Sequence, residues 1–310
     1  MGVRCFFALS GFLICRLLLE DDRPAGAVLM AFYVRRSARI LPAYFVLLAV
    51  LAIAGELRDP WWHLAYLSNV RQVAIREWFT WSAHTWSLGV EEQFYLLAPL
   101  LLLACRRRPG LAIAGALVAS KACRLFLALH DGSYWPNLLP QVAAETLLWG
   151  ALAAVAERRF GAALAARWRW LAGFGALAVA CWALTYGEAL AWNLPPASRA
   201  ADGTLDGLGW AALVLGLWLA PVGSWARRAL SWSPLAWVGG VSYGCYLVHE
   251  PLLCALYPLP VWALWALGLP LTLAAAALSW VLVERPIMRL RDRQARPSPI
   301  KTRGLVVAYW

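Results

Sequence analysis

Residues 84–99 carry the side chains of this sequence that are best suited to chemistry. The run reads HTWSLGVEEQFYLLAP and continues into an apolar stretch that ends at Cys105. A histidine and a carboxylate can transfer protons, and ionisable groups at the mouth of an apolar segment are costly to desolvate without a partner or a reaction. A solvated helix start is the alternative, because carboxylates suit the positive end of a helix dipole. His84 and Glu91 are therefore candidates for catalytic support.

Three arginines form a second cluster, at Arg35, Arg36 and Arg39. Arg36 and Arg39 are three residues apart and share a face if a helix starts there, with Arg35 beside them. Guanidinium groups bind phosphates through paired hydrogen bonds, so the cluster could hold the phosphates of a nucleotide. Anchoring at the cytoplasmic edge of a membrane explains the same arginines, and the residues alone do not choose between the two.

Three more polar residues interrupt apolar segments. Lys121 and Arg124 share a helix face and cannot face lipid cheaply, so we expect them to pair with Glu145 or Glu91. A role in binding an acceptor is possible for them, and a structural ion pair is favoured. His249 could hydrogen-bond across helices, and Pro251 opens the backbone ladder to give it a carbonyl partner. A structural bond is preferred to a catalytic role, because the topology places His249 in the outward part of its helix.

Ser10 and Gly11 are small neighbours within an apolar stretch. Small residues let helix backbones approach closely in a membrane bundle. A seryl nucleophile is the alternative, but no base stands at a fixed spacing from Ser10. Close packing is the preferred interpretation.

The seven cysteines nearly all lie inside apolar stretches and show no C-x-x-C or His/Cys ligand spacing. They are interpreted as small hydrophobic residues, so we expect no metal site.

The elements that must position these side chains are membrane helices. Apolar residues make up 62% of the 310 residues, charged residues 15%, and the mean hydropathy is +0.61. Since about 20 apolar residues span the hydrocarbon core, we predict an all-α, polytopic membrane helix bundle of about nine transmembrane segments. The predicted segments are 3–19, 40–55, 91–105, 111–129, 140–156, 170–187, 207–222, 236–257 and 260–283.

The basic residues predict the orientation of the bundle. Of the 28 Lys and Arg residues, 20 fall in every second connection. The positive-inside rule then puts the C-terminus in the cytoplasm, in a multi-pass protein of the cell inner (plasma) membrane. The net charge of +11 reflects this topology and requires no nucleic acid partner. The predicted cytoplasmic stretches are 20–39, 106–110, 157–169, 223–235 and 284–310.

One membrane domain, 1–290, accounts for almost the whole chain, and a basic cytoplasmic tail, 291–310, follows it. The predicted orientation starts the chain outside with no signal peptide. Together with the odd number of helices, this start leads us to expect that an earlier helix is missing.

Four stretches in this order resemble the acyltransferase 3 family of integral membrane acyltransferases: 6–14, 32–44, 84–99 and 241–251. The VERP sequence at 283–286 is similar to the end of that family's last helix. The resemblance implies transfer of an acyl group, commonly acetyl from acetyl-CoA, to hydroxyls of extracytoplasmic sugars or related acceptors.

The resemblance also implies roles for individual residues. Arg36 and Arg39 match the family's Arg-x-x-Arg element, which favours an acyl-CoA site, and Glu91 matches its carboxylate after Trp-Ser-Leu. The family's base is ascribed to a histidine on a helix that would precede this sequence. We therefore expect a chain that binds the donor with little turnover; appreciable turnover would assign the base to His84 or His249.

The expected function is thus membrane O-acylation, with no bound cofactor and acyl-CoA as co-substrate. The expected partners are the lipid bilayer, acyl-CoA and a carbohydrate or glycolipid acceptor. Two alternatives stay open: a catalytically impaired, truncated relative that acts as a scaffold, and a transporter or flippase, for which no inverted repeat is visible. The sequence does not specify the acceptor, the acyl chain length or the oligomeric state.

Overall fold

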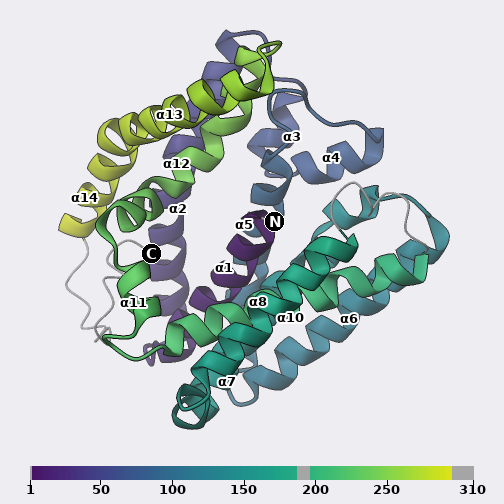
Figure 1. The fold of residues 1–310 in the computed structure, drawn as a ribbon, viewed down its shortest axis with the longest axis vertical. Coiled ribbons are helices and arrows are strands. Elements are labelled where there is room, and N and C mark those ends of the chain that lie inside the picture. The colour runs from purple at the N-terminus through teal and green to yellow at the C-terminus, as the bar shows by residue number, and fades with distance from the viewer. Residues whose placement is uncertain (1, 187–195, 295–310) are drawn as a thin grey trace. The chain divides into compact units, whose positions relative to one another are not determined.

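The computed structural model describes residues 2–186 and 196–294, and every regular element within these ranges is a helix (Figure 1). The long helices are α1 (Gly2–Glu20), α2 (Ala25–Ile53), α5 (Thr85–Ala104), α6 (Pro109–His130), α7 (Pro140–Ala165), α8 (Trp168–Tyr186), α10 (Pro196–Leu219), α12 (Ser233–Leu256) and α13 (Val261–Ser279). The shorter ones are α3 (Pro60–Leu64), α4 (Ser68–Ile75), η1 (Trp135–Leu138), α11 (Trp225–Leu230), η2 (Trp280–Glu284) and α14 (Arg285–Gln294).

Each of the nine predicted segments overlaps one of the long helices, which confirms the predicted fold class. Within the described ranges, five helical stretches are long and apolar enough to cross a membrane. Large apolar side chains such as Leu97, Val118 and Trp265 are 63%, 69% and 72% exposed. Outward faces of this kind suit lipid, because a helix satisfies its backbone hydrogen bonds internally. The chain is a helical, multi-pass membrane protein.

The second predicted segment, 40–55, overlaps the C-terminal part of a longer helix. Helix α2 begins at Ala25, so Arg35, Arg36 and Arg39 lie inside a continuous helix and the preceding connection is only residues 21–24. A helix of 29 residues is about 43 Å long, more than the roughly 30 Å hydrocarbon core. The hydropathy pattern places the start of the segment after the arginines. The helix itself extends past them, and the side chains of Arg36 and Arg39 are buried in the protein.

Packing divides the chain into two compact units. The described residues of the first unit belong to Met1–Leu29, Trp61–Trp78 and Thr85–Ala229. Those of the second unit belong to Met30–Pro60, Phe79–His84 and Leu230–Trp310. In the first unit α7 packs against α1, α6 and α10, and α8 packs against α10. Helix α1 meets α7 at two glycines. A Cβ on Gly11 would collide with the Leu147 carbonyl oxygen, and one on Gly150 with the Ala8 carbonyl oxygen. The predicted close approach at Gly11 is confirmed.

The second unit contains most of α2 with α12, α13, η2 and α14 (Figure 1). Helices α12 and α13 pack together after a short connection, and α13 continues through the π-helical turn η2 into α14. Tyr243 of α12 donates a hydrogen bond from its hydroxyl to the Ile40 carbonyl oxygen of α2 at 2.8 Å. This contact fixes α12 beside the middle of α2.

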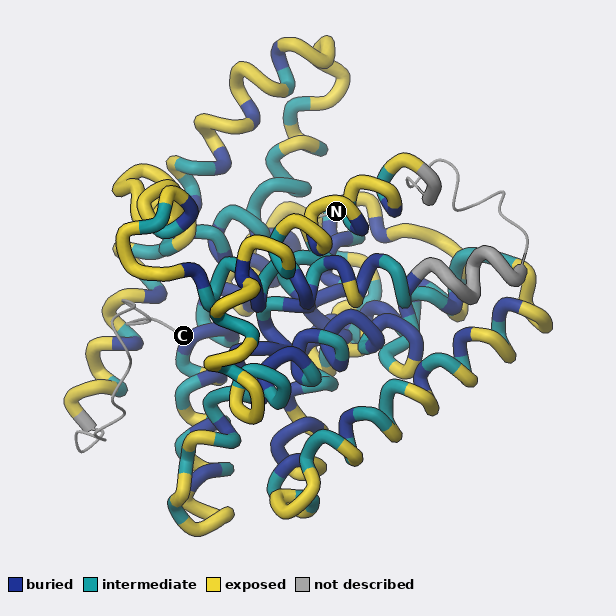
Figure 2. Tube along the Cα trace, turned by 60° about the horizontal axis from the view of Figure 1, so that its bottom comes forward, coloured by how far each residue is buried: buried dark blue, intermediate teal, exposed yellow. Residues whose placement is uncertain are grey.

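Most helices carry both buried and exposed residues (Figure 2), as expected for helices that pack on one side and face lipid on the other. The predicted division into a membrane domain and a basic tail remains a prediction. The tail would begin within α14, and its residues 295–310 lie outside the described residues.

Candidate functional site

His84 is held by a carboxylate that belongs to a helix distant in sequence. It lies immediately before α5, and Glu250 of α12 places Oε2 at 2.6 Å from both the ring Nδ1 and the main-chain nitrogen of His84. The Tyr246 hydroxyl donates to the His84 carbonyl oxygen. The His84 side chain is 5% exposed and that of Glu250 is 22% exposed. An ionised carboxylate only accepts, so Nδ1 carries the hydrogen and Nε2 is the basic nitrogen.

His249 lies beside this pair and has a different partner. Its Nδ1 is 2.6 Å from the Tyr246 carbonyl oxygen, one turn back on the same helix. The predicted bond across helices to a carbonyl that Pro251 opens is not what the structure shows: the partner is the Tyr246 carbonyl oxygen within α12. The ring centroids of His84 and His249 are 5.1 Å apart at an interplanar angle of 67°. Of the two histidines, His84 is the one whose ring nitrogen pairs directly with the Glu250 carboxylate.

Arg36 and Arg39 are buried in the second unit, each 8% exposed, and Arg35 is half-buried. The Arg36 guanidinium lies 5.8 Å from the centroid of the Phe32 ring, and that of Arg39 lies 5.8 Å from the Trp280 ring. Arg39 Nη1 also approaches the Met288 sulfur at 3.9 Å. The aromatic rings and the thioether lie beside the two cations, whose charges are sheltered from solvent by their burial.

Helix α12 links the arginines to the His84 pair. Tyr243 contacts α2 at Ile40, the residue after Arg39, and Glu250 follows seven residues later. Seven residues of helix advance by roughly 10 Å. Ile40, the neighbour of Arg39 in the chain, and His84 thus contact the same helix about two turns apart, within one unit.

Glu91 belongs to the first unit, where hydroxyl groups surround it. Its Oε1 accepts hydrogen bonds from Ser10 Oγ and from the Tyr95 hydroxyl, and these two hydroxyl oxygens are 3.2 Å apart. Glu91 and Ser10 are each 1% exposed and Tyr95 is 3% exposed. The spacing in sequence gave no sign that a carboxylate contacts Ser10. This carboxylate is arranged to hold hydroxyl groups.

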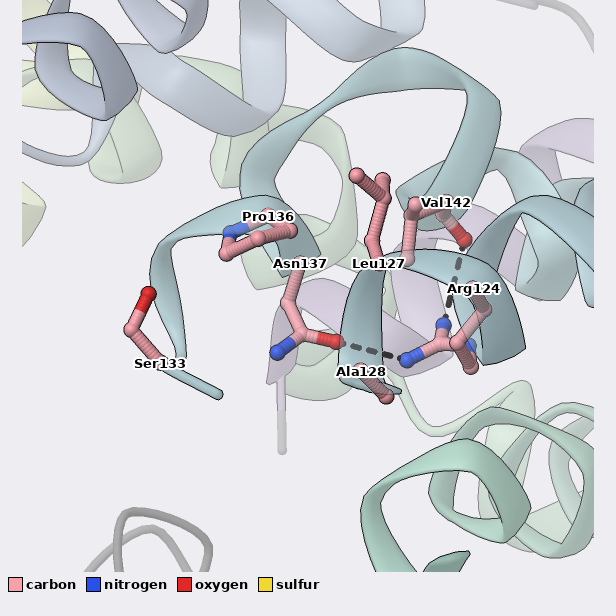
Figure 3. Close-up of a pocket in the computed structure, with 7 residues that line it drawn as sticks. All are labelled: Arg124, Leu127, Ala128, Ser133, Pro136, Asn137 and Val142. Atoms are coloured by element: carbon pink, nitrogen blue, oxygen red, sulfur yellow. Dashed lines mark hydrogen bonds between the residues drawn. The ribbon is translucent and has the colours of Figure 1, made fainter. Parts of the chain in front are cut away.

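Lys121 and Arg124 both pair with Glu145, as predicted. Lys121 Nζ is 3.0 Å from Oε1, and Arg124 Nε is 2.8 Å from Oε2. Figure 3 shows the pocket that Arg124 lines, where its other two nitrogens donate to Asn137 Oδ1 at 2.7 Å and to the Val142 carbonyl oxygen at 3.1 Å. With all three nitrogens donating to protein oxygens, Arg124 serves as a structural member of the first unit.

Two relationships had no signal in the local sequence. Glu250 stood out only as the neighbour of His249, and nothing connected it with His84. Arg4 and Asp206, both inside apolar stretches, form an ion pair at 2.9 Å, to which Thr146 adds a hydrogen bond at 3.3 Å. Ionisable residues within apolar stretches were the available hint for that pair.

The chain matches several known proteins. The family model for the acyltransferase domain matches residues 1–284. Nodulation protein 10 of Rhizobium leguminosarum bv. viciae is 31% identical over 331 aligned positions, which cover 94% of this chain and 82% of that protein. No solved structure matches the chain.

Two further relatives are named as O-acetyltransferases. A putative O-acetyltransferase of Staphylococcus aureus (strain COL) is 30% identical over 43% of this chain and 26% of its own length. The peptidoglycan O-acetyltransferase OatA of Listeria monocytogenes is 26% identical over 93% of this chain. The chain spans about half of the Listeria protein, at 51%. Since the family model covers nearly all of the described residues, the chain belongs to the acyltransferase 3 family of membrane acyltransferases.

Proposed function

We propose that this protein is an O-acyltransferase that moves an acyl group from acyl-CoA to a hydroxyl of an extracytoplasmic sugar, glycan or related acceptor. The acyl group that we expect is acetyl. The names of the staphylococcal and listerial relatives support O-acetylation and a glycan acceptor. The observation that carries the proposal is the carboxylate-anchored His84 in the same unit as the buried Arg36 and Arg39.

Arg35, Arg36 and Arg39 bind the donor in this proposal. Guanidinium groups have the shape and charge to bind phosphate oxygens, and the low exposure of Arg36 and Arg39 strengthens that attraction. The phosphates of coenzyme A would occupy this site, and the pantetheine arm would follow α12 towards His84. The thioester would then reach the end of α12 that carries Glu250.

The resemblance puts the family's base on a helix before this sequence; in this proposal His84 takes that role instead, because Glu250 holds its ring. The Nε2 of His84 takes the proton from the acceptor hydroxyl while the hydroxyl oxygen attacks the thioester carbonyl carbon. The tetrahedral intermediate collapses, the carbon–sulfur bond breaks, and the imidazolium returns the proton to the leaving thiolate, giving the ester and free coenzyme A. Glu250 holds the ring in the correct tautomer and stabilises the imidazolium, as the carboxylate of a catalytic triad does.

Glu91 is a supporting residue of the first unit in this proposal. It already binds two hydroxyls in the first unit, Ser10 Oγ and the Tyr95 hydroxyl, which is the chemistry that a sugar hydroxyl presents. Lys121 and Arg124 contribute structure through Glu145, and His249 contributes its ring next to His84.

The orientation follows from the charges. We propose that the protein resides in the inner (plasma) membrane with residues 106–110 and the C-terminus in the cytoplasm, where coenzyme A is available. Labelling of a single cysteine introduced at Arg107 from the cytoplasmic side supports this orientation. Labelling from the outer side contradicts it.

Acyl transfer by the purified chain in lipid nanodiscs tests the function. Acetyl-CoA and a peptidoglycan or oligosaccharide acceptor are supplied, and free coenzyme A thiol and acetylated acceptor are measured together. Glu250→Gln keeps the shape of the site but cannot stabilise the imidazolium, so the rate should fall by on the order of 10²-fold or more. The exposed Glu56→Gln is the matched control. Acyl transfer that is equally fast in the Glu250→Gln protein contradicts the mechanism.

A further inference from the structure

Glu284 is a buried carboxylate that the proposed reaction does not use. It ends the π-helical turn η2, and it is 1% exposed. Its Oε1 accepts a hydrogen bond from Ser279 Oγ at 3.2 Å. Its Oε2 is buried and has no hydrogen-bond partner among the residues that the structure describes. An unsatisfied buried carboxylate oxygen is costly, so it calls for a hydrogen donor beyond the residues that the structure describes.

Glu284 sits in the wall of the arginine site. Trp280 and Met288, four residues before and after it, both contact the Arg39 guanidinium. In an α-helix, side chains four residues apart differ in direction by about 40° around the helix axis, and the wider π turn makes this difference smaller. The three side chains therefore line one side of the helix, and the charge of Arg39 acts on the Glu284 carboxylate.

We propose that Glu284 Oε2 accepts a hydrogen bond from an N–H or O–H group at the nucleotide end of the acyl donor. This inference rests on the proposed donor site at Arg36 and Arg39. The proposed donor site then combines two guanidiniums for phosphate oxygens with one carboxylate for a hydrogen-bond donor. The ligand class that satisfies both is a nucleoside phosphate with free hydroxyl or amino hydrogens close to its phosphates.

The arrangement makes Glu284 a determinant of specificity. A bare phosphate gains from the arginines but is repelled by the carboxylate, whereas a nucleotide offsets that repulsion with its own hydrogen-bond donor. Removal of the carboxylate should therefore affect the two kinds of ligand differently. Coenzyme A should bind less well, and inorganic pyrophosphate should bind equally well or better.

Calorimetric titration of the purified chain in nanodiscs with coenzyme A and with pyrophosphate tests this prediction. In Glu284→Ala the preference for coenzyme A over pyrophosphate, taken as the ratio of the two Kd values, should fall by about tenfold or more, the usual scale of one charged hydrogen bond. Glu284→Gln keeps the volume of the side chain and should shift the ratio in the same direction. Glu157→Gln, a carboxylate of the first unit that pairs with Arg16, is the matched control and should leave the ratio unchanged.

The other outcomes separate this inference from the donor site itself. Equal weakening of both ligands means that Glu284 only positions Arg39, and unchanged affinities mean that a water molecule satisfies Oε2; either result overturns the inference and leaves the donor site standing. Coenzyme A binding that does not depend on Arg36 and Arg39, or no binding by the wild-type chain, removes the donor site and this inference together.

Discussion

Glu250 Oε2 lies 2.6 Å from both Nδ1 and the main-chain nitrogen of His84, although 166 residues separate the two in sequence. The carboxylate therefore fixes the side chain and the backbone of the histidine at once. A ring held at its Nδ1 has one remaining nitrogen for proton transfer, which is the arrangement that general base catalysis requires.

His84→Ala should lower kcat for acyl transfer by about 10²–10⁴-fold, because a positioned general base contributes that much. His249→Ala should cost less than about tenfold, since the His249 Nδ1 is bonded to a main-chain carbonyl oxygen and not directly to a carboxylate. Release of coenzyme A in the presence of acceptor measures both. The exposed His130→Ala serves as the control. A larger loss for His249→Ala would move the base to that residue.

The double substitution of Arg36 and Arg39 by Ala should weaken acyl-CoA binding by about 2–4 kcal/mol, as expected for lost charge-assisted hydrogen bonds. Arg39→Lys should recover only part of this loss, because an ammonium group cannot make the paired contacts of a guanidinium. Equilibrium binding of coenzyme A in nanodiscs checks the prediction, with the exposed Arg228→Ala as control. Wild-type affinity in the double variant, together with altered membrane orientation, would show that the arginines are anchors.

Gly11→Ala and Gly150→Ala should each destabilise the first unit by about 1–3 kcal/mol, because the added methyl group collides with a carbonyl oxygen of the facing helix. Thermal unfolding in detergent measures the change. Gly115→Ala on α6 is the matched control, since a Cβ there meets nothing within 4 Å. The stability of the Gly115→Ala protein should be unchanged or raised by up to about 1 kcal/mol, because Ala has a higher helix propensity than Gly. Equal effects at all three positions would argue against the tight α1–α7 contact.

Glu145→Ala should destabilise the first unit by about 3–5 kcal/mol, because it leaves the buried Arg124 without its counter-charge. The exposed pair of Arg76 and Asp131 provides the comparison, and Asp131→Asn should cost no more than about 1 kcal/mol. Denaturation of both variants in the same detergent gives the difference. If Glu145→Ala retains wild-type stability but loses acceptor binding, the Lys121–Arg124 group has a functional role.

The sequence by itself determined the class of the protein and the approximate position of its helices. Composition and hydropathy are local properties, and lipid selects for them segment by segment, so nine apolar segments corresponded to nine long helices in the described ranges. Helical periodicity put Arg36 and Arg39 on a common face, and the cost of a charge in lipid predicted the pairing of Lys121 and Arg124 with Glu145.

The tertiary structure decided which distant side chains meet. Glu250 as the partner of His84, Ser10 as the partner of Glu91, and the burial of Glu284 beside Arg39 all depend on which faces of separate helices are opposed. The start of α2 at Ala25 is a further feature that the tertiary structure decided, because only packing shows that Arg36 and Arg39 are buried within this helix. Periodicity specifies a face within one helix, but the partner of that face is selected by packing over the whole unit, which no local pattern encodes.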